Sequence, residues 1–239
     1  MKSQLHAVAA KRFELKYVFD GNYSPTIVDW AEHCLIADPR FPSSKISSIY
    51  FDDYSMSSYR AKRNSEFTKS KLRLRWYDTG NTNSRNDRRE CFLELKSKTG
   101  PSTTKSRVPA KVPRELLLQP FSRDSSLRRT LAEPAAALDG TYSLATPVVL
   151  IAYERRRYID PDSGSRVAID TSIQAFGNET VSWIATRHST LDVGVVEIKG
   201  DQRVLPRPLQ SISSFFFRES FSKYARCCEM LSQPIARRT

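Results

Sequence analysis

The stretch KLRLRWY, residues 71–77, alternates basic and bulky apolar side chains with a period of two. In a β-strand this period places Lys71, Arg73 and Arg75 on one face, and the leucines and tryptophan on the other. Like charges along one strand face repel each other unless an anion or carboxylates lie opposite. For this strand taken alone, a solvated sheet face is the simpler interpretation, since basic side chains usually stay exposed.

The same alternation recurs along the chain, so this strand does not stand alone. Each repeat has an apolar side and a side that mixes Lys or Arg with an occasional Glu or Asp. The repeats are residues 11–19, 90–98, 147–159, 166–170 and 191–199. Residues 46–53 form a further expected strand and residues 104–108 a brief edge strand. Residues 79–89, rich in Gly, Asn, Ser and Arg, indicate a hairpin loop.

Helical spacing of apolar residues predicts helices between the strands. An amphipathic helix is predicted from an N-cap at Ser24, with Pro25 at its first position, to a stop before Pro39. The other predicted helical regions are a short helix at 55–63, a region at 113–138 broken at Pro120 and Pro134, and a closing helix at 221–231. Together with the strands, these helices predict a single α+β domain over residues 1–239, with a core from about 11 to 232.

The formal net charge of +12 over 239 residues implies a polyanionic partner: nucleic acid, a phosphate chain or an anionic membrane. No apolar run approaches the length of a membrane span, and the first ten residues have no apolar core typical of a secretory signal. Four cysteines show no metal-ligand spacing, and the adjacent Cys227 and Cys228 suit reduced thiols. We therefore expect a cytoplasmic protein without a membrane span.

Two architectures account for the charged strand faces. An open sheet with a solvated face explains each strand separately, but not why bases outnumber acids so heavily on those faces. A closed barrel explains the whole set, because its apolar positions would point outward beneath helices and its charges would line a polar lumen around a polyanion. Arg suits bidentate phosphate contacts, and Lys supplies point charges. We therefore predict the barrel.

Three glutamates lie two residues from a lysine on the same strand face: Glu14, Glu94 and Glu197. Simple ion pairing is one interpretation of this spacing. A carboxylate among phosphates can also hold a divalent metal, and Mg²⁺ or Mn²⁺ prefers oxygen ligands. Phosphoryl transfer needs this combination, because it depends on positioning and charge neutralisation more than on covalent chemistry by the protein.

Eight short motifs occur in a fixed order: RFELKY (12–17), IYFD (49–52), LRLRWY (72–77), ELK (94–96), YER (153–155), RVAID (166–170), VEIK (196–199) and SKY (222–224). As a set they resemble the polyphosphate polymerase (VTC) domain, a branch of the triphosphate tunnel metalloenzymes in the CYTH-like superfamily. The resemblance extends from Arg12 to about Leu231. It implies an antiparallel β-barrel, the triphosphate tunnel, with helices packed outside and a C-terminal helix.

The resemblance also implies an activity and a set of site residues. The activity is transfer of the terminal phosphate of ATP, or of another nucleoside triphosphate, to a growing polyphosphate chain with Mn²⁺ or Mg²⁺. Phosphate-binding residues by motif position are Lys16, Arg73, Arg75, Lys96, Arg155, Arg166, Lys199 and Lys223. Glu197 would be the principal metal ligand, with Glu14 and Glu94 as further ligands. Lys71 and Arg157, on the same strand faces, are predicted to contribute to cofactor binding.

One position departs from the family pattern, and other functions remain open. The eukaryotic polymerases carry a basic residue three positions before the last lysine, where this chain has Ser220, with Arg218 nearby. A triphosphatase would share the tunnel and metal but use water as the acceptor. A non-catalytic module that binds polyphosphate or nucleotide is a further alternative. Nucleic-acid binding is disfavoured, because the basic residues alternate on strands and do not cluster with exposed aromatics.

Overall fold

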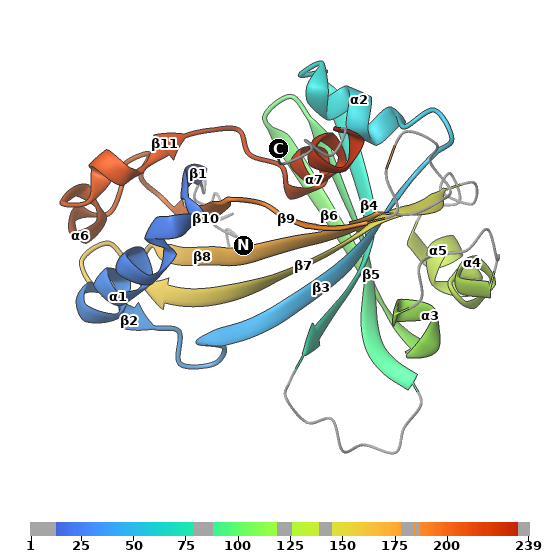
Figure 1. Ribbon diagram of the computed structural model, residues 1–239, viewed down its shortest axis with the longest axis horizontal. Coiled ribbons are helices and arrows are strands. Elements are labelled where there is room, and N and C mark those ends of the chain that lie inside the picture. The colour runs from blue at the N-terminus through green and yellow to red at the C-terminus, as the bar shows by residue number, and fades with distance from the viewer. Residues whose placement is uncertain are drawn as a thin grey trace, which may run out of the picture. The chain divides into compact units, whose positions relative to one another are not determined.

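Figure 1 shows a computed structural model of the chain, which describes residues 13–78, 88–118, 126–138, 145–177, 184 and 187–233. Its strands are β1 (Phe13–Asp20), β2 (Ile36–Ala37), β3 (Ser43–Asp52), β4 (Thr68–Asp78), β5 (Arg88–Thr99), β6 (Ser102–Pro113), β7 (Thr146–Ile159), β8 (Arg166–Gly177), β9 (His188–Thr190), β10 (Val193–Gly200) and β11 (Phe217–Arg218). Its helices are α1 (Ser24–Cys34), α2 (Ser57–Arg63), α3 (Glu115–Leu118), α4 (Ser126–Thr130), α5 (Ala132–Leu138), α6 (Arg207–Gln210) and α7 (Lys223–Ser232), with 3₁₀ turns η1 (Gly21–Tyr23) and η3 (Ser213–Phe215).

The strands form a mostly antiparallel sheet with helices, which confirms the expected α+β class. The strand order is β11-β1-β10-β8-β7-β3-β4-β5-β6, and β2 and β9 pair with β7 and β8 respectively. This order has two ends, β11 and β6, so closure into a barrel stays a prediction. Among the described helices, none has the length and apolar character needed to cross a membrane.

The chain divides into two compact units. The first comprises Met1–Ser43, Arg155–Thr171 and Val193–Ser220; the second comprises Ser44–Glu154, Ser172–Asp192 and Phe221–Thr239. Strands β7 and β8 pass from one unit into the other. The division does not test whether the chain is one domain, so that expectation also stays a prediction.

In the first unit, β1 pairs antiparallel with β10 along its whole length, from Phe13 opposite Gly200 to Asp20 opposite Val193. The apolar side of these strands and of β8 packs against α1 and α6, which lie next to each other in Figure 1. This core consists of Leu15, Phe19, Ile27, Ala31, Leu35, Tyr158, Val167, Ile169, Val196, Ile198 and Leu209. The alternation in the sequence therefore separates an apolar face under helices from a polar face.

Helix α1 starts earlier than the sequence predicts. Its N-cap is Tyr23, and Ser24 is already helical, with φ −53° and ψ −45°. The cause is the 3₁₀ turn η1, which leads directly into the helix and is itself capped by the Asp20 carboxylate accepting from the backbone N–H of Asn22. Ser24 therefore does not act as the cap that we expected.

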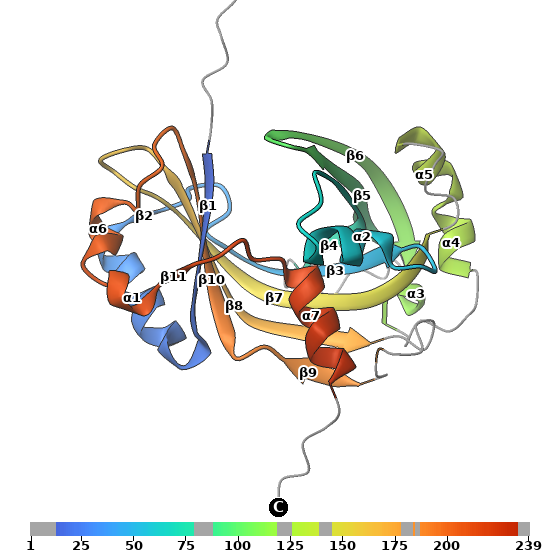
Figure 2. The same cartoon turned by 90° about the horizontal axis from the view of Figure 1, so that it is seen from above.

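In the second unit, β3 pairs antiparallel with β4, β4 with β5, and β5 with β6. Their apolar side packs against α3, α4 and the segment leading into α5. The members of this core are Ile49, Phe51, Leu72, Leu74, Trp76, Cys91, Leu93, Leu95, Ala110, Val112, Leu117, Leu127 and Leu131. Figure 2 shows α4 and α5 on one side of β5 and β6, and α2 and α7 on the other.

Two expectations in this unit were wrong. The edge strand is not brief, because β6 pairs with β5 from Ser102 to Pro113. Pro109 is tolerated within it because β6 lies at the edge of the sheet, with a neighbouring strand on one side only. Pro134 does not break the helical region, because it occupies the first turn of α5, where a backbone N–H is not needed. Residues 79–87 of the predicted loop, Pro120, and Arg12 of the first motif lie outside the described residues.

We predict that Gly194→Ala destabilises the protein because the added methyl group would clash with the Phe19 ring. Gly194 lies opposite Phe19 on β1, and an added Cβ would come within 2.0 Å of the Phe19 ring. Because Phe19 is 1% exposed and cannot move freely, the cost should be about 1–3 kcal/mol in the free energy of unfolding. Thermal and denaturant unfolding would measure it.

The Phe19→Leu background supplies the control. A shorter side chain leaves room for the alanine, so Gly194→Ala should cost clearly less in that background than in the wild type. An identical cost in both backgrounds would show that the ring is not what excludes a side chain at Gly194.

Candidate functional site

The polar face of the second unit carries charged residues in rows across neighbouring strands. In one row Tyr50 of β3 lies opposite Arg73 of β4, which lies opposite Glu94 of β5, which lies opposite Arg107 of β6. The adjacent row places Arg75 between Ser48 and Phe92. Directly opposed residues share a face of the sheet, so the register brings together side chains that are distant in the sequence.

Glu94 is the centre of this face. It is 1% exposed and four basic side chains surround it. Arg73 Nη2 lies 2.7 Å and Arg75 Nε 3.9 Å from Oε2, while Lys105 Nζ lies 2.8 Å and Arg107 Nε 3.6 Å from Oε1. Burial alone would raise the pKa of Glu94, but Arg73, Arg75 and Lys105 outweigh it and lower the pKa to about 2.

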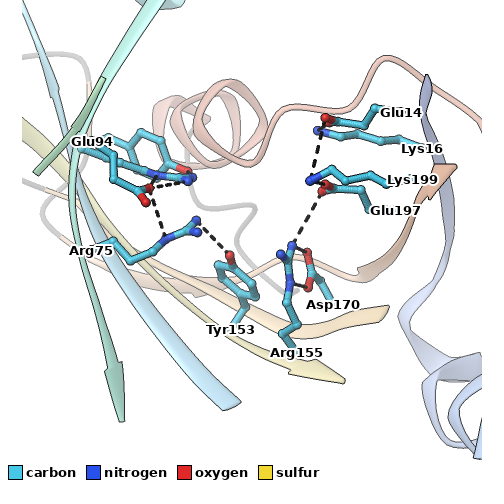
Figure 3. A network of polar contacts seen from close by, with 11 residues as sticks. Glu14, Lys16, Arg75, Glu94, Tyr153, Arg155, Asp170, Glu197 and Lys199 are labelled. Carbon is cyan, nitrogen blue, oxygen red and sulfur yellow. Dashed lines mark hydrogen bonds and ion pairs between the residues drawn. The ribbon is translucent and has the colours of Figure 1, made fainter. Parts of the chain in front are cut away.

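Two phenol groups orient the arginines of this cluster. Arg73 Nη1 donates to the Tyr50 hydroxyl at 3.2 Å, and Arg75 Nη2 donates to the Tyr153 hydroxyl at 3.2 Å. Figure 3 shows Arg75 directed at Tyr153, with Glu94 on its other side. Burial would raise the pKa of Tyr50, but the neighbouring Arg73 and Arg75 lower it overall. Each guanidinium is thus fixed on more than one side before any ligand arrives.

Helix α7 begins on this same polar face. Its N-cap is Ser222, whose hydroxyl accepts from the Ala225 N–H and, at 2.8 Å, from Lys71 Nζ. The next residue, Lys223, holds its ammonium 4.6 Å from the centre of the Tyr153 ring. The first turn of α7 therefore joins the group that contains Arg75 and Lys71.

A buried carboxylate anchors α7. Asp52, 2% exposed, accepts from the Tyr224 hydroxyl at 2.7 Å through Oδ2. Its oxygens also accept from the backbone N–H groups of Ser58 and Tyr59 at 3.0 Å each, in the first turn of α2. The Tyr224 ring stacks on Tyr50 with 5.2 Å between centroids. Asp52 thus ties α2 and α7 to β3, and through Tyr50 to the row of Arg73.

The polar face of the first unit is a second cluster of alternating charge. Glu14 and Lys16 on β1 lie opposite Lys199 and Glu197 on β10, respectively. Lys199 Nζ lies 2.5 Å from Glu197 and 4.0 Å from Glu14, and Lys16 Nζ lies 3.1 Å from Glu14. Figure 3 shows the ends of these four side chains converging.

Arg155 extends this cluster to β7 and β8. It forms a bidentate pair with Asp170, at 2.5 and 2.7 Å, and its Nη2 lies 3.7 Å from Glu197. Burial would raise the pKa of Glu197, but Lys16, Arg155 and Lys199 hold it well below its ordinary value. Burial would lower the pKa of Lys16, but Glu197, Glu14 and Asp170 outweigh it and raise that pKa. Glu197 therefore stays ionised and Lys16 stays protonated at neutral pH.

The sequence matches the VTC domain over residues 11–232, nearly the whole chain. The chain belongs to the VTC domain family. This membership supports a function with phosphate or nucleotide ligands, in a family whose members are generally phosphoryl-transfer enzymes that use divalent metals. No curated protein matches the chain significantly.

Several solved structures are similar over most of their length. A protein of Vibrio parahaemolyticus, described as a proposed adenylate cyclase, is 9% identical with a TM-score of 0.44, over 88% of this chain and 94% of that one. A Pyrococcus horikoshii protein is 14% identical with a TM-score of 0.44, over 90% and 95%. A proposed adenylate cyclase of Bacillus halodurans is 11% identical with a TM-score of 0.42, over 91% and 84%.

The three glutamates that we expected to bind metal, Glu14, Glu94 and Glu197, are not equally suited to it. Among the described residues, no group of three or more His, Cys, Asp or Glu is placed to hold a metal. Glu94 fits poorly, because four cations already face its two oxygens. Glu14 and Glu197 face two cations each, and Mg²⁺ commonly uses one or two carboxylates plus substrate phosphates. These two residues therefore fit a metal better than Glu94 does.

The remaining residues that we predicted to bind phosphate or cofactor lie on or near the polar faces of the two units. Lys96 is exposed between Lys71 and Lys105 in the register of β4, β5 and β6. Arg166 is exposed on β8, opposite Lys199. Arg157 is half-buried and donates to the backbone carbonyl of Phe41 at 3.2 Å. The functional role of each predicted site residue stays a prediction.

Sequence reasoning missed several residues that complete these clusters: Tyr50, Asp52, Lys105, Arg107, Tyr153, Asp170 and Tyr224. All except Lys105 and Arg107 belong to the eight motifs, so the motifs themselves contained a signal. Lys105 and Arg107 lie within the edge strand predicted at residues 104–108, and their alternation there was the signal that could have found them.

We predict that Glu94 stabilises the VTC domain in a pH-dependent way. Its pKa is lowered from an ordinary 4.5 to about 2, so its contribution is fully present above pH 4.5 and is lost as the pH falls through about 2. The destabilisation caused by Glu94→Gln should therefore be greatest at neutral pH, on the order of 3 kcal/mol, and should shrink toward pH 2. Denaturant unfolding across this range would measure it.

Glu90→Gln is the matched control, because Glu90 is exposed on the same face of the same strand. It should change stability little at any pH. A Glu94→Gln effect that stayed constant from pH 7 to pH 2 would mean that the carboxylate charge is not what holds the four cations.

We predict that Tyr224→Phe loosens α7. The substitution keeps the ring that stacks on Tyr50 but removes the O–H donated to Asp52, a hydrogen bond to a charged group worth about 1.5–3 kcal/mol. Backbone amides in the first turn of α7 should exchange faster in hydrogen exchange. Tyr54→Phe, at a side chain 99% exposed, should change nothing. Unchanged exchange in Tyr224→Phe would show that other contacts anchor the helix.

Proposed function

We propose that this VTC domain is a metal-dependent polyphosphate polymerase that transfers the terminal phosphate of ATP to a growing polyphosphate chain. The observation that supports it is the charge balance on the polar face of the second unit, where Arg73, Arg75, Lys105 and Arg107 converge on the single carboxylate of Glu94. One carboxylate cannot neutralise four cations. A triphosphate or a phosphate chain supplies the missing negative charge.

The residues of this face suit phosphoryl transfer in particular. Arg73 and Arg75 present planar donors that match phosphate oxygens, and Tyr50, Tyr153 and Glu94 hold them in place. Donors fixed in advance stabilise the charge that develops on the transferred group without reorganising at the moment of reaction. Lys223 adds a further positive charge from α7, beside Arg75.

The first unit offers the matching components for a metal. Glu197 and Glu14 are the residues that would hold Mn²⁺ or Mg²⁺, and the bound ion would neutralise charge on phosphate oxygens. Lys16, Arg155 and Lys199 keep Glu197 ionised, as its lowered pKa indicates. Lys199, which contacts both carboxylates, would have to shift its ammonium when the ion binds.

A triphosphatase is the second candidate. It would use the same residues to bind a triphosphate, but water would accept the phosphoryl group. Ser220, which stands where the eukaryotic polymerases have a basic residue, is the observation that favours it, because an acceptor phosphate chain would find one charge fewer there.

The deciding experiment is incubation of the protein with ATP and Mn²⁺, with products resolved by chain length. The polymerase should give a polyphosphate ladder and ADP. Orthophosphate and ADP without a ladder would establish hydrolysis, and bound ATP without turnover would establish a binding module. Either result would contradict the proposal.

Within the same assay, we predict that Glu197→Gln abolishes turnover while the protein stays folded. A neutral amide is a poor ligand for a hard divalent cation, and it also leaves Lys16 and Lys199 with less counter-charge. Glu154→Gln, at an exposed glutamate of β7, is the matched control and should keep full activity. Wild-type turnover in Glu197→Gln, with the metal still required, would remove Glu197 from the metal site.

A further inference from the structure

The three arginines around Glu94 are held in two different ways. The side chains of Arg73 and Arg75 are 23% and 9% exposed, and each donates to a phenol hydroxyl. The side chain of Arg107 on β6 is 41% exposed, and its Nε lies 3.6 Å from Glu94, compared with 2.7 Å for Arg73 Nη2. Arg107 is therefore the arginine of this cluster that a ligand from solvent reaches most easily.

An aromatic ring, in place of a hydroxyl, holds the Arg107 guanidinium. Its central carbon lies 3.5 Å from the centre of the Phe92 ring, so the planar group rests against the face of the ring. Phe92 is half-buried, and it makes an edge contact with Tyr77 at 6.4 Å between ring centroids. One face of the guanidinium plane is thus covered by Phe92. The exposure of the side chain leaves the other face accessible to a second flat group.

The strand register places this stack beside the arginines that we propose to bind phosphate. Phe92 lies directly opposite Arg75, and it shares its strand face with Glu94, two residues further along β5. Neighbouring strands are about 4.8 Å apart, and successive residues on one face of a strand are about 7 Å apart. A ligand with a phosphate on Arg75 therefore has the group attached to that phosphate within reach of Arg107.

The chemistry of the stack selects a flat ring. A guanidinium is attracted to the π face of an aromatic ring, and nucleobases stack on arginine planes as well as on aromatic side chains. Such stacking tolerates any base, because every base has a π face. An inorganic phosphate chain has no ring, so it gains nothing from the accessible face of the guanidinium.

From these observations we propose that the Arg107 guanidinium is a stacking platform for the base of a nucleoside triphosphate. Arg107 contacts the base, and Phe92 is a positioning residue that holds the guanidinium plane. The identity of the ligand rests on the proposed function, whereas the platform rests on the Phe92 contact and the strand register. A purine has a larger ring surface than a pyrimidine, so the platform favours ATP over CTP.

The test measures the affinities of ATP, CTP and tripolyphosphate without added metal, so that the metal-dependent turnover does not interfere. Phe92→Leu keeps an apolar side chain but removes the flat ring. We expect ATP affinity to fall about five- to twentyfold, tripolyphosphate affinity to stay within about twofold, and the preference for ATP over CTP to shrink. Phe92→Tyr keeps the ring and should restore ATP affinity.

A second variant tests the platform without changing the ring. Arg107→Lys keeps a positive charge near Glu94 but has no planar group. Its ATP affinity should fall by a similar factor, and its preference for ATP over CTP should shrink in the same way. ATP affinity in Arg107→Lys equal to that of the wild type would overturn the proposal.

Phe41→Leu is the matched control. Phe41 is an exposed phenylalanine of the first unit that also has an arginine beside it, with the Arg40 guanidinium 5.7 Å from the ring centre. Its ATP affinity should stay within about twofold of the wild type. Three further results would overturn the proposal: an equal loss in this control, equal losses of ATP and tripolyphosphate affinity in Phe92→Leu, or a wild type that binds ATP no more tightly than CTP.

Failure of this proposal and failure of the proposed function can be distinguished, because one readout is binding and the other is turnover. A polyphosphate ladder from ATP, with unchanged ATP affinity in Phe92→Leu, would keep the polymerase and remove the platform. A loss of ATP affinity confined to the base, in a protein that makes no ladder, would keep the platform and remove the polymerase.

Discussion

The structure of this VTC domain depends on ion pairs that compensate the many basic side chains on its sheet. The most buried of these are the ion pairs of Glu94. A carboxylate that is 1% exposed is costly to bury alone, and so are the guanidinium groups of Arg73 and Arg75, but together they satisfy one another. Because several cations converge on one anion, the cluster retains a positive excess. That excess is the property that a polyanionic ligand can exploit.

The polar face of the first unit also pairs acidic with basic side chains, but in more nearly equal numbers. Glu14, Glu197 and Asp170 face Lys16, Lys199 and Arg155, so acids and bases are nearly matched there. The two clusters thus differ in chemistry: one carries surplus positive charge, and the other pairs acids with bases and holds Glu197 ionised. Surplus positive charge suits phosphate binding, and ionised carboxylates suit metal binding.

Helix α7 shows how a distant segment completes such a face. Ser222, Lys223 and Tyr224 are consecutive, yet they contact three different elements: Lys71 on β4, Tyr153 on β7 and Asp52 at the end of β3. Asp52 also accepts from the first turn of α2, in which Met56 adopts a left-handed φ of 56° and supplies no side-chain cap. One buried carboxylate therefore holds two helices to the strand that carries Tyr50.

Local alternation in the sequence was enough to predict most of the long strands, their apolar and basic faces and the α+β class, because the period of two directly determines which side chains share a face. The short strands β2, β9 and β11 were not predicted. The ordered motifs were enough to identify the family. The tertiary structure decided which cations surround Glu94, that β6 extends to Pro113 and adds Lys105 and Arg107, and that Asp170 pairs with Arg155. These contacts join residues far apart in the chain, and they depend on strand register and packing, which periodicity within one segment does not encode.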